Sequence, residues 1–331
     1  NDFVCTIHSF CLKFLREEIF RVGYPRTFKV IDEQDLHAIA KEVLEDAGIE
    51  RKEKTVRDLL EDVKNYKVFY SQRYIQSLLL PEAGVSDDDK RIHVVQVILK
   101  QKKYLSLDFD DLIYFTEYIL VKHPDVCGKW QKRFQYVMVD EAQDCNGNDW
   151  NIFTTLSKKY NNLFIVGDPD QAIYEWRGSK PGLFVGFEAD KDIIMAENYR
   201  STSTILDAAN SIITNNKMRV EKNLFTHKTA GSIITHHHGQ DEKEETDWVA
   251  KTIKHFIENG SSASDFAILY RASYLSRSME QSLIRTGISY VVWGGIRFFE
   301  REEIKHALSY LRLIADGEWL RQGRYQIRRI D

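Results

Sequence analysis

The chain contains 331 residues, enough for two or three domains that each bury a hydrophobic core. With 43% hydrophobic and 29% charged residues, its composition is that of an ordinary globular protein. The net charge of −4 excludes nucleic-acid binding through bulk charge, so any such site must be a local patch. The four cysteines include no C-x-x-C pair, which argues against a zinc site and a disulfide framework. Free thiols, without a signal peptide or a membrane-length apolar run, indicate a cytoplasmic protein with no membrane partner.

The N-terminal third is predicted to be almost entirely helical. Apolar residues recur at helical spacing over residues 7–22, and Gly23-Tyr24-Pro25 ends that helix. Further apolar stripes of helical period fill residues 35–105, where the acidic stretch 86–89 indicates a linker and a helix N-cap. Because the chain begins at Asn1 without a methionine, we expect it to be a piece of a longer protein.

The pattern changes after residue 107. An amphipathic helix is predicted over 108–120, and two apolar runs at 136–139 and 163–166 each end in acidic residues, with a helix between them. Strands that alternate with helices are typical of a parallel sheet covered on both faces. Ligands of such sheets bind beyond the carboxyl ends of the strands, which is where both acidic clusters lie.

A second series of strands and helices predicts a second, incomplete α/β domain. Its strands are expected at 193–195, 233–237, 266–270 and 290–293. Its helices are expected at 205–213, 248–257, 275–284 and 304–313.

The strongest chemical signal is the string Y-V-M-V-D-E-A-Q-D at 136–144, in which a buried strand ends in two carboxylates. Phosphoryl transfer needs a Mg²⁺ ion near the phosphates and a group that orients or deprotonates the attacking water. Asp140 suits the metal role because Mg²⁺ prefers oxygen ligands, and Glu141 suits the water role. For a bare D-E pair, a solvated acidic strand end is the better interpretation. The full string favours catalysis.

The next signal is G-D-P-D-Q-A-I-Y-E-W-R-G-S at 167–179, a turn that follows the second of these strands. Gln171 offers a neutral hydrogen-bonding side chain close to the expected nucleotide. Tyr174, Trp176 and Arg177 bring two aromatic rings and a guanidinium together, and bases of single-stranded DNA stack on such rings. Aromatic residues taken alone belong to a core more often than not. Their spacing beside charged residues on a turn favours DNA binding.

These motifs resemble those of the UvrD/Rep-type superfamily 1 DNA helicases. V-D-E-A-Q-D, G-D-P-D-Q-A-I-Y-E-W-R-G and E-N-Y-R-S (197–201) look like the family's motifs II, III and IV, in the same order. T-I-H-S-F at 6–10 is similar to the T-x-H-S DNA-contact motif, and L-D-F-D-D-L at 107–112 is similar to the D-F-D-D-L element. L-Y-R at 269–271 and G-G-I-R-F-F-E-R-E-E-I at 294–304 match the second motor domain.

The resemblance covers about residues 4–316 and implies an α/β fold. Two incomplete RecA-like P-loop NTPase lobes, built on parallel sheets, would carry an inserted all-helical subdomain. The first lobe would comprise residues 1–26 and 107–192, and the inserted subdomain residues 27–106. Residues 193–316 would form part of the second lobe, and the tail at 317–331 has no identified counterpart.

The resemblance also implies an ATP-driven motor that moves 3′ to 5′ on single-stranded DNA and unwinds duplex junctions. Asp140 would coordinate Mg²⁺, and Glu141 would activate water for ATP hydrolysis. Gln171 would sense the γ-phosphate and relay the nucleotide state to the DNA site. Arg200 would act as an arginine finger, and Tyr199 would lie near the nucleotide base. A plain helix-start charge is the alternative for Arg200, but the helix dipole disfavours a cation there.

DNA contacts are implied at two places in the chain. Tyr174 and Trp176 would stack on bases with support from Arg177, whereas Thr6 and His8 would touch the DNA backbone. For His8, an equally good interpretation is a partly buried histidine whose ring nitrogens form hydrogen bonds within the protein. The pathway served, whether repair, replication restart or recombination, is not indicated, and neither are protein partners.

Parts of the family's machinery are absent from the 331 residues. They contain no G-x-x-x-x-G-K-[ST] phosphate loop, which in the family precedes the T-x-H-S motif, and no motifs V and VI. We therefore expect this polypeptide alone to bind ATP poorly and not to unwind DNA, which filter binding of labelled ATP would test. Two alternatives stay open. The chain could be a non-catalytic fragment that binds single-stranded DNA or has a regulatory role, or it could be the motor part of a RecB/AddA-like helicase–nuclease.

Overall fold

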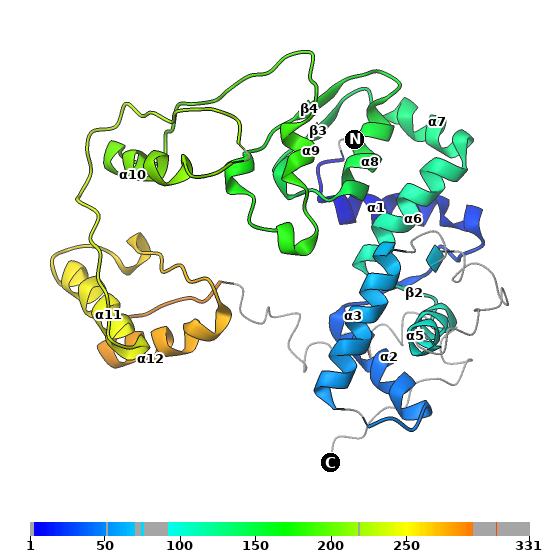
Figure 1. The fold of residues 1–331 in the computed structure, drawn as a ribbon, viewed down its shortest axis with the longest axis horizontal. Coiled ribbons are helices and arrows are strands. Elements are labelled where there is room, and N and C mark those ends of the chain that lie inside the picture. Colours follow the sequence, from blue (N-terminus) through cyan, green and yellow to red (C-terminus); the bar gives the residue numbers. More distant parts are fainter. Residues whose placement is uncertain are drawn as a thin grey trace. The chain divides into compact units, whose positions relative to one another are not determined.

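The computed structural model describes residues 3–50, 52–69, 74–75, 92–217, 219–293 and 309. The chain divides into two compact units, residues 1–232 and 233–331, and Figure 1 shows their elements. Several predicted features lie outside the described residues: the linker at 86–89, the motif at 294–304, the helix at 304–313 apart from Ser309, and the tail at 317–331. No helix in the described ranges is both long enough and apolar enough to cross a membrane.

The first unit begins with the helix that the sequence predicts. α1 (Ile7–Glu18) continues into the 3-10 turn η1 (Ile19–Val22), and Gly23 ends it with a φ of 76° that favours glycine. The buried face of α1 packs on α6 (Phe109–Lys122), which corresponds to the helix predicted at 108–120. The N-terminal segment and residues 107–122 thus pack together although about ninety residues separate them.

A group of helices follows, as the apolar stripes predict. It consists of α2 (Glu33–Asp46), α3 (Glu53–Phe69) and α5 (Ile92–Lys103), which pack against one another. The Asp32 carboxylate accepts the first N–H groups of α2 in a capping box. Two parallel strands that we did not predict, β1 (Lys29–Val30) and β2 (Ser106–Leu107), flank the group. Two residues are too few for a strand periodicity to be recognised.

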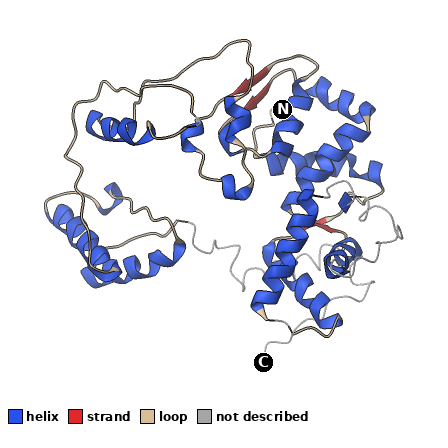
Figure 2. Ribbon diagram, viewed as in Figure 1, coloured by secondary structure: helices blue, strands red, loops and turns tan. Residues whose placement is uncertain are grey.

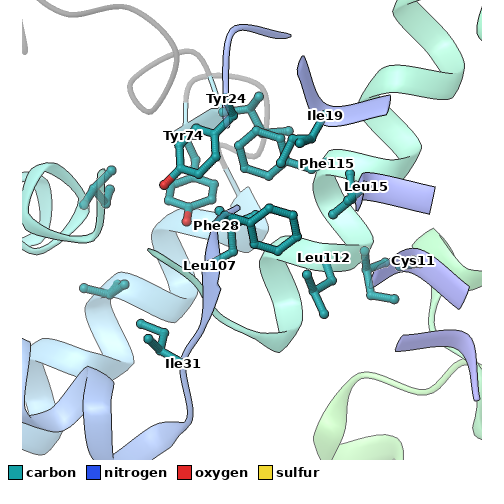
Figure 3. Close-up of a cluster of buried hydrophobic side chains, with 14 of the residues drawn as sticks. Cys11, Leu15, Ile19, Tyr24, Phe28, Ile31, Tyr74, Leu107, Leu112 and Phe115 are labelled. Carbon is teal, nitrogen blue, oxygen red and sulfur yellow. The ribbon is translucent and has the colours of Figure 1, made fainter. Parts of the chain in front are cut away.

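Large side chains fill the core of this unit. Figure 3 shows Tyr24, Phe28 and Phe115 close together, and the ring centroids of Tyr24 and Phe115 lie 5.9 Å apart. Trp130 is fully buried, and its indole N–H donates to the Glu18 carboxylate at 3.0 Å. It belongs to α7 (Pro124–Arg133), a helix that we did not predict because it is short and contributes only two buried apolar residues, Val126 and Trp130. Burial of each such ring stabilises the fold by roughly 1.5–3 kcal/mol.

A buried ionic network joins α3 to the start of α6. The Lys67 ammonium donates to the carboxylates of Asp108 and Asp111, at 2.8 Å to Asp111. The Tyr74 hydroxyl also donates to Asp111, as does the Gln101 amide at 3.4 Å. Asp108 and Asp111 form the capping box of α6 as well. The D-F-D-D-L element therefore both starts its helix and anchors the helical group.

The predicted parallel sheet is present and short. β3 (Val137–Val139) pairs in parallel with β4 (Leu163–Ile165), and α8 (Gly147–Ser157) connects them, as Figure 2 shows. One face packs on Trp150 and Phe153 of α8. In the described part of the chain the other face, with Met138, is exposed, so the prediction of two covered faces holds for one face only.

Three of the remaining helices correspond to predicted ones: α10 (Ser203–Ile213) in the first unit, and α11 (Glu242–Glu258) and α12 (Ser276–Thr286) in the second. The short helix α9 (Pro181–Val185) of the first unit was not predicted. The strand predictions at 193–195, 233–237, 266–270 and 290–293 are wrong for this structure, which has no strand pairing there. An apolar run becomes a strand only where a neighbouring backbone completes its hydrogen bonds.

Candidate active site

The two candidate catalytic carboxylates directly follow β3. The Asp140 carboxylate accepts the N–H of Glu141 at 3.0 Å, and both residues are exposed. Glu141 adopts a left-handed conformation with φ 52° and ψ 41°. Such a conformation costs a residue with a side chain about 1–3 kcal/mol and is typical of functional sites. Both acidic groups therefore reach solvent at the carboxyl end of a parallel strand.

Gln143 connects this carboxylate pair to the next strand. It is buried in the 3-10 turn η2 (Ala142–Asp144), and its amide N–H donates to the Glu141 carboxylate at 2.7 Å. Its carbonyl oxygen accepts the backbone N–H of Asp168 at 3.0 Å. A Cβ atom at Gly167 would lie 2.6 Å from that carbonyl oxygen, so the glycine makes room for the link. We assigned Gln143 no role from the sequence; its position inside D-E-A-Q-D was the available signal.

Asp168 organises the turn after β4. Its carboxylate accepts the N–H of Asp170 at 3.0 Å and so begins the 3-10 turn η3 (Pro169–Gln171). The Gln171 side chain is exposed, and its amide donates to the second Asp168 oxygen at 2.9 Å. Glu141, Gln143, Asp168 and Gln171 thus form one continuous chain of hydrogen bonds. The structure brings Gln171 into the same network as the carboxylate pair.

The aromatic residues of the same turn lie on the surface. Trp176 is 64% exposed, and its indole N–H donates to the carbonyl of Ile173 at 3.1 Å. Tyr174 is 37% exposed and precedes the 3-10 turn η4 (Glu175–Arg177). Neither ring belongs to the buried core, so the core interpretation of these aromatics does not fit. Arg177 is the last residue of η4, and its side chain lies outside the described part of the structure.

Tyr199 and Arg200 lie on a turn before α10. The Asn198 side chain accepts the N–H groups of Arg200 at 3.0 Å and of Ser201 at 2.7 Å. The Tyr199 hydroxyl donates to the Glu197 carboxylate at 2.6 Å, which raises the pKa of that tyrosine. Within the described residues, the Arg200 side chain makes no hydrogen bond or ion pair with the carboxylate pair. The structure therefore does not bring the candidate finger to the acidic residues.

Thr6 and His8 lie at the N-terminus of α1. The Thr6 hydroxyl caps the helix by accepting the N–H of Ser9 at 3.3 Å. His8 is half-buried, with its ring edge-on to Phe109 at 5.8 Å between centroids. Both side chains therefore have a local structural role, and their contact with DNA stays a prediction.

A divalent cation fits the chemistry of the exposed carboxylates. No group of three or more metal-ligating side chains occurs among residues that the structure describes. Mg²⁺ does not need such a cage, because it is commonly held by one or two carboxylates together with phosphate oxygens and water. The carboxylate of Asp140 supplies oxygen ligands at the carboxyl end of β3, where the phosphates of a bound nucleotide would lie.

Comparison with known proteins identifies the family of this chain. Residues 2–192 match the UvrD/REP helicase N-terminal domain, and residues 193–318 match the UvrD-like helicase C-terminal domain. The chain belongs to the UvrD/Rep helicase family. It is 36% identical over 322 residues to the ATP-dependent DNA helicase PcrA of Staphylococcus aureus and to that of Staphylococcus epidermidis. These alignments cover 94% of this chain and 43% of each relative, so the chain spans less than half the length of these helicases.

The UvrD/Rep assignment covers both halves of the candidate site. The carboxylate pair and the Gln171 turn lie in the part that matches the N-terminal domain, whereas Tyr199 and Arg200 lie in the part that matches the C-terminal domain. The α/β architecture with helical insertions agrees with this family, as the motifs predicted.

Proposed function

We propose that the protein carrying this chain is an ATP-dependent DNA helicase that translocates 3′ to 5′ on single-stranded DNA in the cytoplasm and unwinds duplex junctions. The observation that carries the proposal is the hydrogen-bonded chain from Glu141 to Gln171. It joins a carboxylate suited to water activation to a turn that presents aromatic rings to solvent. One short segment can therefore respond to both ATP and DNA.

Each group has a distinct task in ATP hydrolysis. Asp140 would hold the Mg²⁺ ion, which when bound neutralises charge on the phosphates. Glu141 would orient the attacking water and accept its proton. Gln171, held by Asp168, would donate a hydrogen bond from its amide N–H to the γ-phosphate. Arg200 would stabilise the charge of the transition state, and Tyr199 would lie against the nucleotide base.

The direct test is ATP hydrolysis by the full-length protein with and without single-stranded DNA. We expect DNA to stimulate hydrolysis and the protein to unwind a duplex that carries a 3′ single-stranded tail, with little unwinding of one that carries a 5′ tail. If single-stranded DNA did not change the rate of ATP hydrolysis, the proposed coupling of hydrolysis to DNA would be refuted. Unwinding only from a 5′ tail would refute the proposed 3′ to 5′ polarity.

Trp176→Ala is expected to weaken binding of single-stranded DNA. Loss of one stacking ring costs about 1–3 kcal/mol, or roughly 5- to 150-fold in Kd. Fluorescence anisotropy of a labelled oligonucleotide at fixed salt concentration measures this change. Tyr160→Ala, which removes a partly exposed ring elsewhere in the first unit, is the matched control and should bind DNA as the wild type does. Equal affinity of the two variants would remove Trp176 from the DNA site.

A further inference from the structure

A second ionic cluster lies next to the Gln171 turn. The Lys222 ammonium donates to the carboxylates of Asp168 and Asp170, at 3.2 Å to Asp170. The Asn216 amide donates to the other Asp170 oxygen at 3.2 Å, and Arg219 Nε lies 3.9 Å from Asp170. The Asp170 side chain is only 5% exposed and that of Lys222 only 12%. These are partly desolvated charges that depend on one another.

The cluster joins the two family domains within the first unit. Its carboxylates lie in the part of the chain that matches the N-terminal domain, and its cations in the part that matches the C-terminal domain. Two carboxylates face two cations, so the charges balance. Without Lys222, two neighbouring carboxylates would share the more distant Arg219 alone, and buried like charges repel.

The cluster also controls the acceptor that holds Gln171. Asp168 gives one carboxylate oxygen to Lys222 and the other to the Gln171 amide. Burial would raise the pKa of Asp168, but the hydrogen bonds from Lys222 and Gln171 outweigh this effect and lower it. Asp168 therefore stays ionised, and both of its carboxylate oxygens remain hydrogen-bond acceptors. Any displacement of the Lys222 segment acts on Gln171 through a single carboxylate.

We propose that Lys222 is a positioning residue that fixes Gln171 for ATP hydrolysis and makes its placement depend on the C-terminal domain. This inference rests on the proposed function. Lys222 touches neither nucleotide nor DNA in this scheme. It holds Asp168, which holds Gln171, and the Gln143 link continues the same network to Glu141.

The kinetic test uses Lys222→Met, Lys222→Arg and Lys217→Met in the full-length protein. Because a misplaced group near the reacting atoms can cost about 100-fold in rate, we expect kcat of Lys222→Met to fall by about 10- to 100-fold. The KM for ATP should stay within about threefold, because phosphate binding is untouched. Lys222→Arg keeps the charge and should recover most of the rate. Lys217→Met, an exposed lysine of the same segment, should behave as the wild type.

Non-additivity separates positioning from loss of fold. Combining Lys222→Met with Gln171→Ala should lower kcat no further than Gln171→Ala alone, because both changes remove the same group from its place. If the loss of kcat in the double variant equalled the product of the losses in the two single variants, the proposal would be overturned. A normal kcat in Lys222→Met when the wild type hydrolyses ATP would overturn it as well, whereas a wild type without DNA-stimulated hydrolysis would instead refute the proposed function.

Hydrogen exchange tests the same link without ATP. In the full-length protein, peptides that cover residues 167–172 should exchange faster in Lys222→Met than in Lys217→Met, because the turn loses the ion pair that restrains it. The double variant Asp170→Asn/Lys222→Met removes the repelling charge and preserves folding, but Asp168 still lacks its lysine. We expect it to keep the fast exchange, and wild-type exchange in this double variant would overturn the proposal.

Discussion

Glu141→Gln is expected to lower ATP hydrolysis by the full-length protein by about 10²–10⁴-fold, the range for loss of a general base. Glutamine has the same shape as glutamate and can still accept the hydrogen bond that Gln143 donates. It cannot take a proton from water. ATP and DNA binding should therefore stay near wild-type values, as measured by filter binding and fluorescence anisotropy, while phosphate release almost ceases.

Glu175→Gln provides the control for this substitution. Glu175 is an exposed acidic residue on η4, near the candidate DNA-binding rings but outside the hydrogen-bonded chain. Its replacement changes the net charge by the same amount and should leave kcat unchanged. If Glu141→Gln retained turnover, Glu141 would have no role as a base, and the left-handed conformation at that position would need another explanation.

The position of the carboxylate pair could be predicted from the sequence because it follows from local rules. An apolar run that ends in acidic residues, followed by a helix and a second such run, determines a parallel pair with both acidic groups at one edge. The parallel pairing of β3 and β4 agrees with that prediction. The exposure of Trp176 was likewise indicated by its charged neighbours on a turn.

The links between these groups could not be predicted in the same way. Lys222 lies 54 residues from Asp168, and Gln143 reaches Asp168 across 25 residues. Neither pair has a periodicity or a spacing rule, because the contact exists only after the strands and turns have packed. The strand predictions after residue 193 failed for the same reason: hydrophobicity marks a segment that can pair, but pairing depends on a neighbour.

Lys67→Met is expected to lower the stability of the first unit strongly and in a pH-dependent manner. Lys67 is the cation in the buried network with Asp108 and Asp111. Removing one partner of a buried ion pair costs about 3–5 kcal/mol, because uncompensated charge stays in the interior. Methionine fills a similar volume, so the loss should reflect charge rather than a cavity.

The pKa values of the two carboxyls set the direction of the pH effect. Burial and the nearby Asp108 charge raise the pKa of Asp111 to about 7, although Lys67 opposes them. Burial would also raise the pKa of Asp108, but Lys67 outweighs it and the net shift is downward. Because the folded pKa of Asp111 exceeds its unfolded value near 4, its stabilising contribution is full below about pH 4 and is lost as the pH rises through 7.

Without Lys67, the pKa of Asp108 should rise as well, because burial is then opposed only by the hydrogen bonds of Asp108 with Asp111. The folded variant would then bind protons more tightly than the unfolded chain over a wider pH range. Its free energy of unfolding should therefore fall further below that of the wild type at pH 8 than at pH 5. Urea unfolding at both pH values measures this difference. Lys64→Met, an exposed lysine about one turn earlier on α3, should change stability by less than about 0.5 kcal/mol. A deficit that is equal at the two pH values, or no larger than that of Lys64→Met, would show that the charge of Lys67 does not hold α3 to α6.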